Sequence, residues 1–328
     1  MIVSVAILGI VRKFLSPSSI RWLPLCLTGL LAGVAVPDAF PQGPMPEEGA
    51  TLFPSGAFVS YSSIFTSGRL EKGAGADAPG ATTHPTFQHR VPLTLSWSFR
   101  RDLQFSSEFS IVTKRADLPG DELGGTGLGD TLITLKYRFL RLDSERGTTQ
   151  LAATIGPKLP TGTAGLRDSG GSLFPVQLQP GSGSTDLFAK VNGTHTGLFN
   201  LRRLVLDGSF SYLARTEGSR RVRLGNEAET RFWLHYRPYQ ARLVGPEWFI
   251  GPSVTWRRRG HDRQRGIRQP FTGGEEVAAG FTTYVSPVGG LVFWFGLEFP
   301  VYHDSRGAAH EPARRMNIGV TKQFVLRP

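Results

Sequence analysis

Charged side chains occupy alternate positions in several extended segments of this 328-residue chain. Lys136 and Arg138, for example, alternate with Leu135, Tyr137 and Phe139. Successive side chains of extended backbone point to opposite faces, so the charges gather on one face and the bulky apolar residues on the other. The candidate site residues on the charged face are Glu108, Lys136, Arg138, Lys158, Lys190, Glu229, Arg231, His235, Arg237 and Glu298.

A face that carries both acids and bases has two chemical uses. If it lines a water-filled passage, it selects solutes by their charge. If the acids and bases pair with one another, it closes the passage with ion pairs. The sequence leaves both alternatives open.

Catalytic and metal-binding chemistry is not indicated. His261, His303 and His310 are each followed directly by an acid, and adjacent side chains of an extended chain point apart. The only cysteine is Cys26, and the spacing of the histidines does not match a zinc site. The segment 180–184 resembles a phosphate loop only superficially, because it lacks the required lysine. We expect no enzyme, no cofactor and no metal ion.

The elements that position these side chains are predicted to be β-strands. Polar and bulky apolar residues alternate with a period of two after residue 52, which is the pattern of strands with one apolar face. Twelve segments share the pattern, centred near residues 58, 94, 108, 134, 153, 189, 208, 232, 252, 280, 295 and 319. After the N-terminal region no apolar run approaches the roughly 20 residues of a membrane helix, which excludes a helical membrane protein.

The connections between these segments alternate between short and long. Short turns are predicted at 101–102, 143–146, 195–199, 239–243 and 286–289, and long connections at 65–86, 115–125, 160–182, 215–225, 258–274 and 303–313. An outer-membrane barrel with both ends in the periplasm has this arrangement of short periplasmic turns and long external loops. Because lipid offers no hydrogen bonds, strands span it only in a closed sheet. We therefore predict an all-β fold, a transmembrane antiparallel up-and-down β-barrel of about twelve strands in residues 52–328.

The N-terminal region has the three parts of a secretory signal. Arg12 and Lys13 supply positive charge, residues 23–36 are mostly apolar, and small residues follow at Ala35 and Ala39. We predict a signal peptide in residues 1–35, with cleavage as late as residue 39, and a periplasmic lead-in in residues 36–51. An N-terminal anchor helix is the alternative.

Three motifs resemble a known family. Gly127, Gly129 and Asp130 belong to a GLGD segment before a strand, Pro160, Thr161 and Gly162 belong to a K-x-P-T-G segment that closes the next one, and Pro180, Gly181 and Gly183 belong to an LQPG-x-GS segment. Their order and spacing over residues 126–190 is similar to that of the Phenol MetA-type outer-membrane transporter family, named for a phenol-degradation pathway protein. The resemblance implies a barrel that passes small, often aromatic or apolar, compounds. The glycines and prolines are expected to set turns and bulges at the barrel rim rather than to bind a ligand.

The segment 258–274 is predicted to be a strongly basic external loop. Its arginines are Arg257, Arg258, Arg259, Arg263, Arg265 and Arg268, opposed by Asp262 alone. Nucleic acid is one class of partner for such a run, but we expect no nucleic-acid partner here. Anionic lipopolysaccharide on the cell surface accounts for it with fewer assumptions, and steering of anionic solutes is a further option.

These observations lead to one function and two alternatives. The chain is expected to be a channel or transporter of the bacterial outer membrane that admits small hydrophobic or aromatic solutes. A narrow anion-selective porin and a structural surface barrel with a plugged lumen are the alternatives. Outer-membrane lipid, lipopolysaccharide, a small-molecule solute and the barrel assembly machinery are the expected partners, although Phe324 is followed by four more residues where such barrels usually end on an aromatic residue.

Overall fold

The structure of the protein is a computed structural model. It describes residues 56–72, 82–118, 121–168, 170–218, 220–240, 246–270, 272–288, 290–304 and 310–325. The predicted signal peptide in residues 1–35 and the lead-in in residues 36–51 lie outside the described residues.

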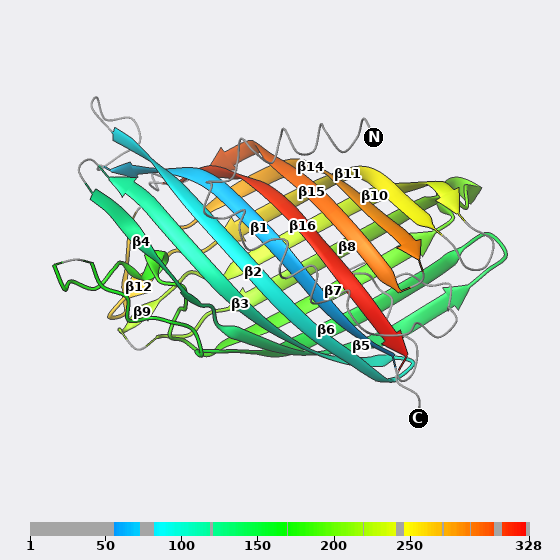
Figure 1. The fold of residues 1–328 in the computed structure, drawn as a ribbon, viewed down its shortest axis with the longest axis horizontal. Coiled ribbons are helices and arrows are strands. Elements are labelled where there is room, and N and C mark those ends of the chain that lie inside the picture. The colour runs from blue at the N-terminus through cyan, green and yellow to red at the C-terminus, as the bar shows by residue number, and fades with distance from the viewer. Residues whose placement is uncertain are drawn as a thin grey trace. The chain divides into compact units, whose positions relative to one another are not determined.

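Long strands make up most of the described chain (Figure 1). The barrel strands are β1 (Gly56–Lys72), β2 (Thr82–Arg100), β3 (Leu103–Leu118), β4 (Asp121–Leu128), β5 (Thr131–Asp143), β6 (Thr148–Leu159), β7 (Asp186–Thr196), β8 (Leu204–Ala214), β10 (Glu227–Gln240), β11 (Glu247–Arg259), β14 (Gly274–Val288), β15 (Leu291–Asp304) and β16 (His310–Val325). Each pairs antiparallel with its neighbours in the sheet.

The sheet closes on itself as a twelve-stranded barrel, which confirms the predicted fold class. Closure is made by β1 and β16, which are paired from Gly56 opposite Val325 to Leu70 opposite His310. β4 and β5 both pair with β3, one after the other, so they are two halves of a single strand interrupted at Gly129 and Asp130. All twelve predicted strand centres fall inside these strands.

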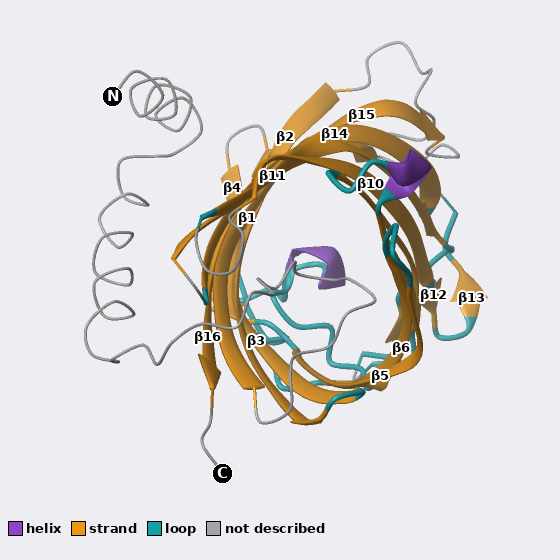
Figure 2. Cartoon of the chain, turned by 90° about the vertical axis from the view of Figure 1, so that its right-hand side faces the viewer, coloured by secondary structure: helices purple, strands orange, loops and turns teal. Residues whose placement is uncertain are grey.

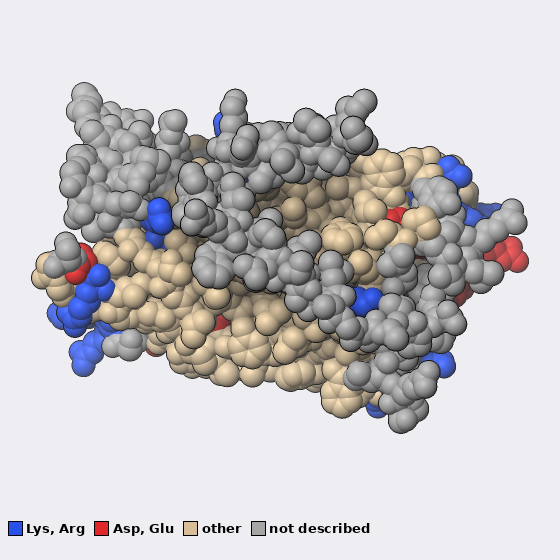
Figure 3. Space-filling model, in the orientation of Figure 1, with Lys and Arg blue, Asp and Glu red and all other residues tan. Residues whose placement is uncertain are grey.

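Apolar and polar side chains separate onto the two faces of the wall. In β5, Leu135, Tyr137 and Phe139 are 41%, 49% and 50% exposed, and they alternate with more buried Lys136 and Arg138. Figure 3 shows few charged side chains over the middle of the visible face, apart from the part covered by grey atoms. An outer surface this apolar requires an apolar surrounding, because soluble proteins rarely expose patches of such extent. No helix among the described residues has the length and apolar character needed to cross a membrane.

Three of the predicted long connections, 65–86, 115–125 and 303–313, are partly wrong, because the strands continue into them. In the last of these, β15 runs to Asp304 and β16 starts at His310. β3 runs to Leu118 and β4 starts at Asp121, so segment 115–125 is mostly strand. β1 and β2 likewise extend to Lys72 and back to Thr82, into the predicted loop 65–86. These extensions lack the strict alternation of the membrane segments, because a strand beyond the lipid has no apolar face to bury.

The connections 160–182, 215–225 and 258–274 carry structure of their own. The short strands β9 (Val222–Arg223), β12 (Arg263–Gln264) and β13 (Ile267–Arg268) form a separate three-stranded sheet, ordered β13-β12-β9. The 3-10 helix η2 (Val176–Leu178) lies in the connection between β6 and β7 and contacts β3 and β4. In the end-on view of Figure 2, loops and a short helix lie inside the ring of strands. A second 3-10 helix, η3 (Leu198–Asn200), forms the turn between β7 and β8.

Candidate functional site

The carboxylate of Asp130 joins the three sequence motifs into one cluster. It lies at the interruption between β4 and β5, and one of its oxygens is 2.7 Å from Nζ of Lys158 on β6. The backbone N–H of Ser182 and its hydroxyl donate to the same oxygen, at 2.9 and 2.6 Å. The backbone N–H of Gly162 donates to the other oxygen at 3.1 Å. One buried acid therefore fixes both ends of the 160–185 loop.

The motif cluster continues into an ion-pair network towards β8. Nζ of Lys158 also lies 2.7 Å from Asp186, the first residue of β7. Arg215, just after β8, pairs with Asp186 at 3.2 Å and with Glu227 at 2.8 Å. Burial lowers the pKa of Arg215, but Glu227 and Asp186 outweigh it and the pKa is raised above its ordinary value. The charged form of this guanidinium is thus favoured at its buried position.

Close contacts between glycines hold the loop against itself. A Cβ added to Gly162 would lie 2.7 Å from the Cα of Gly181, so a side chain at either position would separate the two segments. A Cβ at Gly127 would meet Thr163 at 2.8 Å and Pro180 at 3.1 Å. The motif glycines are needed where segments approach one another, which is consistent with the expected structural role.

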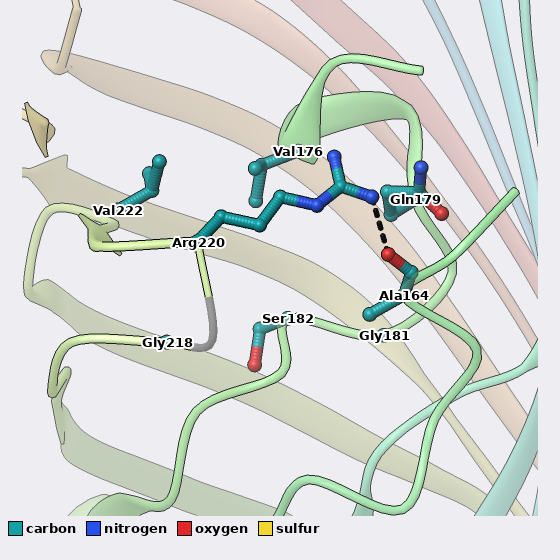
Figure 4. A pocket seen from close by; sticks show the side chains of 8 residues that line it. All are labelled: Ala164, Val176, Gln179, Gly181, Ser182, Gly218, Arg220 and Val222. Atoms are coloured by element: carbon teal, nitrogen blue, oxygen red, sulfur yellow. Dashed lines mark hydrogen bonds between the residues drawn. The ribbon is translucent and has the colours of Figure 1, made fainter. Parts of the chain in front are cut away.

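The middle of the 160–185 loop is held by strand β3 and by the connection between β8 and β10. Nζ of Lys114 on β3 donates to the carbonyl of Gln179 at 2.8 Å. The buried side-chain amide of Gln179 donates to Leu166 and accepts from it, at 2.9 Å each. Arg220, in the connection between β8 and β10, donates to the carbonyls of Ala164 and Phe174. Figure 4 shows Arg220 reaching across to Ala164.

A small cavity remains beneath Arg220 (Figure 4). Its volume is about 10 Å³, which is at most the space of one water molecule. It is lined by Ala164, Val176, Gln179, Gly181, Ser182, Gly218, Arg220 and Val222. The cavity is therefore a packing gap under the loop and is too small for an organic solute.

A second cluster, the inner ion network, spans five adjacent strands. It consists of Glu229, Arg231, Arg257, Glu276, Glu298 and Arg315. Arg257 is at its centre, 2.7 Å from Glu229, 3.1 Å from Glu276 and 2.6 Å from Glu298. Arg231 on β10 reaches Glu298 on β15 at 3.7 Å although β11 and β14 lie between their strands. Such a contact is possible only on the concave side of the wall, so the network faces the lumen.

Aromatic rings cover the inner face nearer the short turns. Phe249 lies opposite Tyr284, and Tyr284 lies opposite Trp294, on the three neighbouring strands β11, β14 and β15. The ring of His235 meets Tyr284 edge-on, with centroids 5.4 Å apart. The guanidinium of Arg237 lies over the ring of Phe249 at 4.5 Å. These five residues are called the aromatic row.

His235 is held from both sides by polar groups. Its Nδ1 lies 3.2 Å from the carboxylate of Asp207, which in turn accepts the hydroxyl of Thr194 at 2.6 Å. Its Nε2 lies 3.4 Å from the hydroxyl of Thr282, two strands away. His235 and Asp207 are both about 2% exposed, so the pair is a buried polar element of the wall.

The other residues predicted from the alternation lie on the same inner side. Glu108 pairs with Arg90, and Arg138 donates to Gln150 at 2.9 Å. Lys136 lies opposite Gln104, and Lys190 opposite Thr154. The structure brings Glu229, Arg231 and Glu298 into one network, places His235 and Arg237 in the aromatic row and puts Lys158 in the motif cluster.

Sequence reasoning missed several partners of these residues. Glu276 and Arg315 lie in strands whose alternation is weak near the long connections, so their face was not predicted. Arg257 was wrongly assigned to the basic loop, because the run of three arginines hides the end of the strand. It is an inner residue of β11. Asp262 does not neutralise the positive charge of the basic loop either. It is 2% exposed, and its carboxylate is paired with Arg259 at 2.9 Å.

The His, Asp and Glu side chains of the described residues are possible metal ligands. Among these residues, no group of three or more His, Cys, Asp or Glu residues is arranged to hold a metal ion.

Comparison with known proteins defines the fold but not the family. No protein-family model matches the sequence, and no curated protein matches it. Among solved structures, the chain is similar to the COG4313 outer membrane channel from Pseudomonas putida F1, with 17% identity and a TM-score of 0.61 over 86% of this chain and 100% of the other. The chain therefore has the fold of an outer-membrane β-barrel.

More distant likenesses include two further channels. The TodX monoaromatic hydrocarbon channel has 8% identity and a TM-score of 0.41 over 84% of this chain and 91% of the other. The NanC porin has 10% identity and a TM-score of 0.40 over 82% of this chain and 100% of the other. With TM-scores this low, neither contributes to the argument about this chain.

Proposed function

We propose that this protein is a channel of the bacterial outer membrane that admits small solutes through its lumen. The observation that carries the proposal is the separation of the two faces of a closed barrel. The outer face exposes bulky apolar side chains, and the inner face carries the inner ion network. A closed sheet with this polarity satisfies its backbone in lipid and keeps water-compatible groups inside.

Small hydrophobic or aromatic compounds are the proposed solutes. The aromatic row makes this part of the inner wall apolar, and Trp294 is its one ring that is not buried, since Phe249 and Tyr284 are only 5% and 7% exposed. The resemblance of the three motifs to the Phenol MetA-type family supports the same class of solute. In the structure these motifs form one cluster around Asp130, so they act together as the anchor of the 160–185 loop.

An anion-selective porin is the second candidate. It is favoured by Arg138 and Arg237, inner-face guanidinium groups that make no direct ion pair among the described residues, although Asp102 and Asp143 lie near Arg138 and Glu247 near Arg237. A third possibility, a structural barrel, would have the 160–185 loop as a permanent plug.

Currents and uptake measured on the same purified barrel separate these candidates. In planar bilayers, the proposed channel gives small currents with weak ion selectivity, and vesicles containing it take up toluene faster than empty vesicles. A large, strongly anion-selective current without faster toluene uptake would replace the proposal by the porin. A barrel that shows neither current nor uptake would be structural. Trp294→Ser should slow toluene uptake with little effect on the current, because it removes the partly exposed ring of the row without changing charge.

The proposed location in the outer membrane implies a route of export and assembly. The periplasmic lead-in, the signal peptide and recognition by the barrel assembly machinery belong to the route by which a barrel reaches the outer membrane. Immunodetection of the protein in separated outer and inner membrane fractions tests the location.

A further inference from the structure

The small sheet β13-β12-β9 aligns three arginines across its strands. Arg263 on β12 lies directly opposite Arg223 on β9 and directly opposite Arg268 on β13. Residues directly opposite one another in an antiparallel sheet project to the same side, with Cβ atoms about 5 Å apart. The three guanidinium groups therefore leave one face of the sheet together.

Two further arginines extend this basic surface. The backbone N–H of Arg265 donates to the carbonyl of Arg221 at 2.7 Å, which joins the β12–β13 turn to the start of β9. Both residues have positive φ, 52° for Arg265 and 54° for Arg221, and both are exposed. We call the set of Arg221, Arg223, Arg263, Arg265 and Arg268 the arginine sheet.

The neighbouring carboxylates do not neutralise the arginine sheet. Asp262 is buried and bound by Arg259 and by the backbone N–H of Gly225. Glu217 forms a backbone bridge with Arg223, but its carboxylate makes no ion pair among the described residues. Like charges placed directly opposite each other destabilise a sheet. An external anion that lies between the guanidinium groups would remove this repulsion.

The position of the arginine sheet identifies the source of the anion. β9, β12 and β13 belong to connections at the long-loop end, and Figure 2 shows β12 and β13 outside the ring of barrel strands. Resting on the proposed outer-membrane function, this places the arginines above the outer leaflet rather than over the channel mouth. The anions at that level are the phosphate groups of lipopolysaccharide, and guanidinium groups bind phosphate with paired hydrogen bonds.

We propose that the arginine sheet binds the phosphate groups of lipid A from the surrounding leaflet. Arg263 is the central contact because it is flanked by an arginine on each side. Arg257 and Arg259 take no part, since Arg257 is paired with Glu298 of the barrel wall and Arg259 with Asp262 of the connection after β11.

Binding of defined lipids to the detergent-solubilised, full-length barrel tests the proposal. The probes are diphosphoryl lipid A, monophosphoryl lipid A, dephosphorylated lipid A and inorganic phosphate, measured by native mass spectrometry or calorimetry. We expect affinity to fall in that order for the three lipids and to weaken with salt. Arg263→Gln should lower the affinity for diphosphoryl lipid A by about ten-fold, the effect of losing one charged contact. The control Arg146→Gln removes an exposed arginine from a short turn at the other end and should leave it unchanged.

Each other outcome contradicts the inference. Equal binding of dephosphorylated and diphosphoryl lipid A would show that the protein does not recognise the phosphate groups. Inorganic phosphate that binds as tightly as the lipid would make it a site for free phosphate. Unchanged affinity of Arg263→Gln, with the variant shown to be folded by its heat-dependent gel mobility, would exclude the arginine sheet. Conductance of the same preparations is measured separately. A barrel that conducts but does not bind lipid A would contradict this inference alone. A barrel that binds lipid A but does not conduct would contradict only the proposed channel function.

Discussion

Nζ of Lys158 lies 2.7 Å from the carboxylate of Asp130, although 28 residues separate the two in sequence. The same ammonium contacts Asp186, where the chain re-enters the wall after the 160–185 loop. The loop is thereby held at the points where it leaves and rejoins the barrel. Its position within the ring of strands depends on this ion pair and on the hydrogen bonds that Asp130 accepts from Gly162 and Ser182.

Replacement of Asp130 by asparagine should loosen the loop. The variant loses the charge that accepts hydrogen bonds from Lys158 and Ser182, so we expect the free energy of unfolding to fall by about 2 kcal/mol. Mean single-channel conductance should rise at the same time. The control Asp143→Asn changes an exposed acid at a short turn and should alter neither quantity. An unchanged conductance in D130N, with the loss of stability, would mean that the loop does not obstruct the lumen.

Gly181→Ala should give the same rise in conductance by a steric route. The added methyl group would meet the Cα of Gly162 at 2.7 Å, and the two loop segments must then separate. Gly165→Ala is the matched control, because a Cβ there meets nothing within 4 Å. If both alanine variants conduct alike, close packing of Gly181 is irrelevant to passage.

Adjacent residues of β8 test the assignment of the two faces. Phe210 is 48% exposed on the outer face, and an arginine there should cost roughly 2 to 4 kcal/mol of folding free energy in lipid. Ser211→Arg places the same charge on the inner face, between Glu229 on one neighbouring strand and Lys190 on the other, and should cost less than the arginine at Phe210. Urea-dependent refolding into lipid vesicles measures both. Equal losses would contradict the described register.

Arg257 should control ion selectivity. Arg257→Gln leaves the carboxylates of Glu229, Glu276 and Glu298 with fewer counter-charges, so the reversal potential in a salt gradient should shift towards cation selectivity. The exposed neighbour Arg258, changed to glutamine, removes the same charge from outside the network and should shift it less. Equal shifts in the two variants would show that total charge, rather than the inner ion network, sets selectivity.

The strands were predictable from the sequence because lipid imposes a strict period of two. Leu135, Tyr137 and Phe139 had to face away from Lys136 and Arg138, and the structure places them so. The inner position of His235 followed from the same alternation. What alternation cannot give is the partner of an inner residue, since contacts such as Arg231 with Glu298 cross two intervening strands and depend on barrel curvature.

Loop structure was harder to predict for a different reason. The three motifs were recognised as glycine- and proline-rich segments, but their convergence on Asp130 depends on backbone groups that carry no sequence signal, such as the N–H of Gly162. The end of β11 was misplaced because Arg257, Arg258 and Arg259 look alike in sequence. Only the carboxylates around Arg257 distinguish an inner strand residue from an exposed one.

The pairing of β1 with β16 has a consequence for biogenesis. These strands come from opposite ends of the barrel sequence, so the seam that completes the cylinder cannot form before the last strand has been synthesised. Until then the growing sheet has two open edges capable of pairing with any exposed strand nearby. A truncation that removes β16 should therefore leave a product that does not close and that aggregates through its open edges.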